Sequence, residues 1–257
     1  MGRTPYLAAG VGLALAAAAT ARAAPATRKE VFELSAELEA RVAAHQELVN
    51  NAGRSADDFC KLTADTVKIL DPVVTELARF GGSEHQSIPF EAIERAYTRT
   101  QWLVPGLVLV ATEEFTQTGI DYKALARMGP AEARPLLRAM GDFEIGAEGI
   151  ESWGVRITDY SACQAPERGR AALAGLVKTW VAAPSCLRDA LRARLTGELE
   201  QMVGWTCYCA ARDPALAAVR KNADILKKLT DARGPELAKR WLESARAPDA
   251  QFSCRPN

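Results

Sequence analysis

Six cysteines constrain the fold of this 257-residue chain more than any other feature. They stand at Cys60, Cys163, Cys186, Cys207, Cys209 and Cys254. An even number of cysteines in an exported chain is typical of disulfides formed in an oxidising compartment, so we predict three disulfides. Zinc is the rival interpretation, but Cys207-Tyr208-Cys209 lacks the two-residue gap of zinc hairpins and has no histidine nearby. We therefore predict no metal site.

The N-terminus is typical of a cleaved secretory signal, which we assign to residues 1–23. Arg3 and the free amino group precede the 13-residue apolar run from Leu7 to Ala19, and Ala21-Arg22-Ala23 provides small residues for signal peptidase. This run is shorter than the roughly 20 residues that span a bilayer, and no later segment reaches that length. We expect a mature chain that has no transmembrane segment and is periplasmic or secreted.

Apolar residues recur every three or four positions through most of the mature chain, which predicts amphipathic helices. The pattern predicts an all-α, disulfide-stabilised helical bundle of about eight helices. We expect a single helical domain over residues 24–257. A finer division would place an N-terminal sub-bundle at 24–119 and a C-terminal bundle at 130–257.

The first predicted helix runs from Val31 to Val49, and the second begins at Ser55-Ala56-Asp57-Asp58 with a capping hydroxyl and first-turn acids. Pro72 either kinks or restarts the second helix. A third helix begins near Pro89, and regular helices return after Pro166, one of them opened by Asp213-Pro214 as cap and first position.

Two segments are harder to assign from the pattern. Leu107 to Ala111 is apolar throughout, and five residues suit a strand, but we favour a buried helix that leads into Glu113-Glu114-Phe115. Glycine and proline recur from Gly129 to Gly154, which predicts a fragmented stretch without regular helix.

Helix length constrains the disulfide pairing. Cys163 precedes a predicted helix near 167–182 and Cys186 opens the next, so the two lie about 24 Å apart at opposite ends of a hairpin. A disulfide needs Cα atoms within about 7 Å, which excludes this pair. Cys207 and Cys209 follow the second helix of this hairpin, which runs back toward the end where Cys163 lies. We predict that Cys163 pairs with one of them and Cys254 with the other. Cys60 then pairs with Cys186.

Composition excludes several functions. The chain has 32 basic and 32 acidic residues, so no net field attracts it to nucleic acid. It has two histidines, His45 and His85, and no Cys-x-x-Cys-His run for covalent haem, so we expect no cofactor. We expect His45 to be a packed or interface side chain. Tryptophan is a core anchor by default, and we regard Trp153 and Trp205 as the better surface candidates.

The most distinctive stretch runs from Gly141 to Gly154 and holds four acids, four glycines and no basic residue. If it is helical, Glu144, Glu148 and Glu151 share one face, with Trp153 close behind. We predict that these four residues bind a partner, cation or sugar. The alternative is an ordinary solvated face, because most charged rows face water.

These observations favour an exported, non-enzymatic helical binding protein of the inhibitor, immunity or adaptor type. Its partner would be another envelope or secreted protein. The alternative is an envelope-glycan hydrolase or lyase, which needs two carboxylates, one of them kept protonated by an apolar setting. In that case the pair would be Glu113 or Glu114 with Glu148 or Glu151.

Overall fold

A computed structural model describes residues 32–81, 88–112, 116–143, 155–158 and 161–254. Within these ranges the protein is an all-α, disulfide-linked bundle, as predicted, with nine α-helices and six short strands. The helices are α1 (Ala36–Asn51), α2 (Ala56–Gly81), α3 (Phe90–Leu103), α4 (Tyr122–Met128), α5 (Arg134–Phe143), α6 (Pro166–Ala182), α7 (Ser185–Gly204), α8 (Arg212–Leu226) and α9 (Gly234–Ser244). The strands are β1 (Leu107–Ala111), β2 (Thr116–Ile120), β3 (Val155–Thr158), β4 (Ser161–Gln164), β5 (Cys207–Tyr208) and β6 (Gln251–Phe252).

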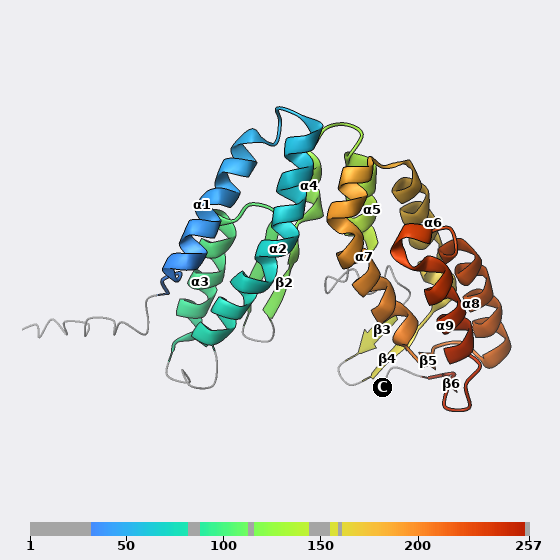
Figure 1. The fold of residues 1–257 in the computed structure, drawn as a ribbon. Coiled ribbons are helices and arrows are strands. Elements are labelled where there is room, and N and C mark those ends of the chain that lie inside the picture. The colour runs from blue at the N-terminus through green and yellow to red at the C-terminus, as the bar shows by residue number, and fades with distance from the viewer. Residues whose placement is uncertain (1–31, 82–87, 113–115, 144–154, 159–160, 255–257) are drawn as a thin grey trace, which may run out of the picture.

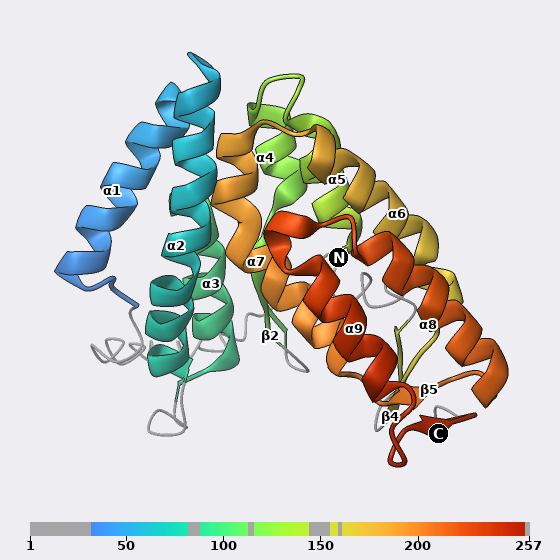
Figure 2. The ribbon, with the colours of Figure 1, turned by 45° about the vertical axis from the view of Figure 1, so that its right-hand side comes forward.

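The helices form two groups that lie side by side (Figures 1 and 2). The N-terminal group contains α1, α2, α3 and the β1–β2 hairpin, and the C-terminal group contains α4 to α9. Helix α2 packs against α7 and joins the groups, and one cluster of buried apolar residues includes side chains from both. No helix among the described residues has both the length and the apolar character needed to cross a bilayer.

Capping side chains set the starts of the first two helices. The Ser35 hydroxyl accepts a hydrogen bond from the Leu38 amide, so α1 begins at Ala36 and not at Val31 as predicted. The Ser55 hydroxyl accepts from the Asp58 amide at 3.0 Å, which is the predicted start of α2. The later expectation for Asp213 is wrong, because α8 already begins at Arg212.

Helix α2 continues through Pro72 without a restart. A proline inside a helix has no N–H, so the carbonyl four residues earlier, that of Lys68, loses its usual donor. The Arg41 guanidinium of α1 donates to this Lys68 carbonyl at 3.2 Å. A side chain from the neighbouring helix therefore replaces the missing backbone donor, and the interruption becomes an α1–α2 contact.

The favoured helix at Leu107 to Ala111 is wrong, because these residues form strand β1, which pairs antiparallel with β2 from Leu107 opposite Ile120 to Ala111 opposite Thr116. Gly106, with φ of 102°, turns the chain after α3 in a conformation that other residues rarely adopt. Leu107, Leu109 and Ala111 are buried, while the side chains between them are not. The two-residue period decides in favour of a strand.

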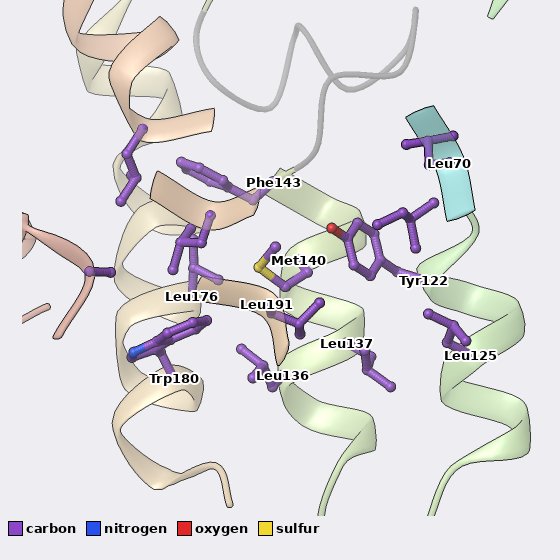
Figure 3. Packing of buried hydrophobic residues seen from close by; sticks show 14 of the residues in the cluster. Leu70, Tyr122, Leu125, Leu136, Leu137, Met140, Phe143, Leu176, Trp180 and Leu191 are labelled. Carbon is purple, nitrogen blue, oxygen red and sulfur yellow. The ribbon is translucent and has the colours of Figure 1, made fainter. Parts of the chain in front are cut away.

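Two helices, α4 and α5, are not among those predicted from the sequence. Helix α5 forms inside the stretch that we expected to be fragmented, and it buries Leu136, Leu137, Met140 and Phe143. Figure 3 shows Leu136, Leu137 and Met140 beside Leu191, with Leu125 and Tyr122 on one side and Leu176 and Trp180 on the other. This apolar stripe outweighs the effect of the neighbouring glycines and prolines.

The three disulfides join Cys60 to Cys186, Cys163 to Cys209 and Cys207 to Cys254, with Cα–Cα distances of 5.8, 5.0 and 6.2 Å. This pairing confirms the prediction from helix length. Cys60–Cys186 links α2 to the first turn of α7. The other two link β4, β5 and the chain after β6, which are neighbouring parts of one small sheet with the order β3-β4-β5-β6.

We predict that Arg41→Met lowers the free energy of unfolding by about 1 kcal/mol, the usual contribution of one hydrogen bond. In a Pro72→Ala background the Lys68 carbonyl regains a helical donor, so the same Arg41 change should cost less. Urea unfolding of the four oxidised proteins in this double-mutant cycle measures the difference. An equal loss in both backgrounds would mean that Arg41 does not compensate for Pro72.

Candidate functional site

The acidic residues predicted from the sequence cannot be placed in this structure. Glu113, Glu114, Glu144, Glu148, Glu151 and Trp153 all lie outside the described residues, as does His85. The binding face of Glu144, Glu148 and Glu151 therefore stays a prediction, and so does the carboxylate pair of a glycan-cleaving enzyme. The described residues hold three other features with functional potential: a buried histidine, a buried glutamate and an exposed tryptophan.

His45 is fully buried and its two ring nitrogens both face oxygen atoms. Nδ1 lies 2.8 Å from an Asp65 carboxylate oxygen of α2, and Nε2 lies 2.9 Å from the Pro105 carbonyl. Both partner atoms lie within hydrogen-bond distance of the ring. His45 thus holds α1, α2 and the chain before β1 together, which confirms the expectation of a packed histidine. In this arrangement neither nitrogen faces a substrate.

Glu198 of α7 is a buried carboxyl group with 5% of its side chain exposed. Oε1 lies 2.8 Å from the Arg194 guanidinium, and Oε2 has no hydrogen-bond partner among the described residues. Burial raises the pKa of Glu198, and the nearby charge of Arg194 opposes that rise. The sequence carried a signal for this site, because Glu198 stands three residues after Leu195 and falls on the face of the leucine stripe.

Trp102 contradicts the expectation that tryptophan is a core anchor at this position. Trp180 and Trp241 are buried and Trp205 is half-buried, but Trp102 on the last turn of α3 is 81% exposed. Tryptophan is enriched at the centres of protein interfaces, so an exposed tryptophan is a candidate contact residue. The α3 stripe buries Ala96, Tyr97 and Thr100, so the helix is fixed to the core while Trp102 faces solvent.

A groove between α1 and α3 lies beside this tryptophan. It has a volume of about 220 Å³ and is lined by Phe32, Leu34, Glu39, Val42, Ala43, Gln46, Arg99, Thr100 and Leu103. Residues three apart are neighbours on a helix surface, so Trp102 lies next to Arg99 at the edge of the groove. The Gln46 amide donates to the Leu103 carbonyl at 3.0 Å and fixes the two walls to each other.

The fold and its cross-links define a class: a helical protein stabilised by three disulfides, as suits an oxidising, extracytoplasmic environment. Comparisons with protein-family models, with curated proteins and with solved structures found no match for this chain. Among the residues that the structure describes, no group of three or more His, Cys, Asp or Glu side chains is placed to hold a metal ion.

We predict that the stability of Glu198→Gln relative to the parent increases as the pH rises from 4 to 7. Because the pKa of Glu198 is raised in the folded state, the unfolded chain releases this proton at a lower pH than the folded chain does. The contribution of Glu198 to the free energy of unfolding therefore falls as the pH rises above the pKa of the unfolded state. Glutamine keeps the shape and has no such dependence. Urea unfolding should show a stability difference between variant and parent that grows from pH 4 to pH 7.

Glu94→Gln, at an exposed position of α3, is the control and should show little change. A difference that does not vary with pH would contradict the raised pKa.

Proposed function

We propose that this protein is an exported, non-enzymatic binding protein that engages another protein of the cell envelope or a secreted protein. One observation carries the proposal: Trp102 is 81% exposed, and it lies three residues along α3 from Arg99, which lines the α1–α3 groove. Leaving an indole in water forgoes about 2 kcal/mol or more of hydrophobic stabilisation. A partner that covers Trp102 recovers this free energy on binding.

The composition of the groove suits a protein partner. Phe32, Leu34, Val42 and Leu103 supply apolar walls, while Glu39 and Arg99 provide one charge of each sign. Protein interfaces combine an apolar centre with a polar rim in this way. We infer that a partner inserts one apolar side chain into the groove and packs a second against Trp102.

The scaffold around the groove supports tight binding. Hydrogen bonds hold α1 to α2 and α3: His45 bonds to Asp65 of α2, and Gln46 donates to the Leu103 carbonyl of α3. The Cys60–Cys186 disulfide ties α2 to α7. A rigid surface loses little conformational entropy on association, so more of the contact free energy appears as affinity.

We predict that Trp102→Ala abolishes capture of a stoichiometric partner from a native envelope extract, because the side chain is the central anchor. With the purified partner, the dissociation constant should rise by about 30-fold or more, the usual cost of losing a hot-spot residue. Isothermal titration calorimetry on oxidised protein measures this change.

Val181→Ala is the matched control, since Val181 of α6 is 60% exposed and lies on another helix group. It should bind the partner as the parent does. A partner that binds Trp102→Ala as tightly as it binds the parent would refute the proposed surface. The same holds if the parent protein captures no partner.

A further inference from the structure

Helices α4 and α5 form a second hollow, distant in sequence from the α1–α3 groove. Its volume is about 420 Å³, and it is lined by Lys123, Ala126, Arg127, Arg134 and Arg138. Four of the five lining residues are cations and none is an acid. The positive charge of its lining distinguishes this hollow from the α1–α3 groove, whose charged lining residues are one acid and one arginine.

The sequence places the four cations together through helical spacing. Lys123 and Arg127 are four apart on α4, and Arg134 and Arg138 are four apart on α5. The two helices pack against each other through buried faces that include Leu125 and Leu137. All four basic side chains therefore lie on the exposed side of the α4–α5 pair.

Stability does not explain this arrangement. Like charges four apart on a helix destabilise it by a few tenths of a kcal/mol per pair. Some exposed cations of the described chain pair with acids: Lys61 with Asp58, Lys227 with Asp224 and Arg233 with Glu236. No ion pair found among the described residues includes any of the four cations of the hollow.

One of the arginines is fixed by the backbone. Arg134 Nε donates to the Gly129 carbonyl at 3.2 Å, which leaves its terminal nitrogens to point elsewhere. Gly129 is itself held close to the core, because a Cβ at this position would lie 2.5 Å from the Phe59 ring. The loop between α4 and α5 thus sets the position of the Arg134 side chain.

We propose that this hollow binds a ligand that carries phosphate groups. Guanidinium groups match phosphate oxygens with two parallel hydrogen bonds, and three of the four cations are arginines. The volume exceeds that of a single phosphate and accommodates a small ligand with two phosphate groups. The same chemistry would recognise a soluble phosphorylated compound or the headgroup of an anionic phospholipid.

The test is isothermal titration calorimetry of the oxidised full-length protein with inorganic pyrophosphate at constant ionic strength. We expect binding by the parent and at least a tenfold loss in Arg127→Gln/Arg138→Gln. Arg134 stays unchanged in this variant because its hydrogen bond belongs to the fold. Both substituted side chains are exposed, so the thermal midpoint should stay equal or rise as repulsion falls.

The control variant is Arg220→Gln/Arg240→Gln, which removes the same charge from exposed positions on α8 and α9. It should bind pyrophosphate within twofold of the parent. A parallel arm uses phosphatidylcholine vesicles with and without phosphatidylglycerol. Vesicle binding that is lost in Arg127→Gln/Arg138→Gln identifies a lipid source, and pyrophosphate binding alone identifies a soluble ligand.

Three results would overturn the proposal. The first is no binding of pyrophosphate or of anionic vesicles by the parent protein. The second is an equal loss in both double variants, because general attraction of anions by surface charge then suffices. The third is equal affinity for a glutamate peptide of the same charge, which shows a site for acidic protein segments and not for phosphate.

Discussion

The contact between α2 and α7 determines how the two helix groups fit together. Cys60 lies in the first turns of α2 and Cys186 in the first turn of α7, so their disulfide fixes the starts of both helices at one level. Helix α7 has 20 residues and spans about 30 Å. Cys207 and Cys209 follow its far end and join the sheet strands and the C-terminal tail. Helix α7 is therefore covalently tied near both ends, and buried residues along its length belong to the shared core.

Buried polar groups supply the specificity that apolar packing lacks. Gln164 of β4 donates to the Met202 carbonyl of α7 and accepts from the Trp241 indole of α9. His45 similarly joins three segments of the N-terminal group. A buried polar group that loses its hydrogen-bond partners raises the free energy of the folded state, so alternative packings of the same apolar stripes are disfavoured. Leucine stripes alone tolerate a shift in helix register, whereas these bonds do not.

Sequence reasoning succeeded where the answer depends on local geometry along the chain. The disulfide pairing follows from helix rise and short loops, and both are readable from the period of apolar residues. It failed where a tertiary neighbour decides. Pro135 and Gly141 indicated a broken segment, but Pro135 lies in the first turn of α5, where no amide donor is needed. Gly141 lies against Tyr122, where the absence of a side chain permits close packing.

Trp102 shows why a binding surface is harder to predict than a core. Its helix has a clear buried stripe, but the stripe does not say which other helix covers the adjoining face. That depends on the position of α1. Hydrogen bonds from Arg41, His45 and Gln46 fix this position, and their partners lie 27, 20 and 57 residues further along the chain. The same contacts that fix α1 form the groove beside Trp102. The expectation that tryptophan anchors a core therefore failed at a position that the buried stripe of α3 leaves on the outer face.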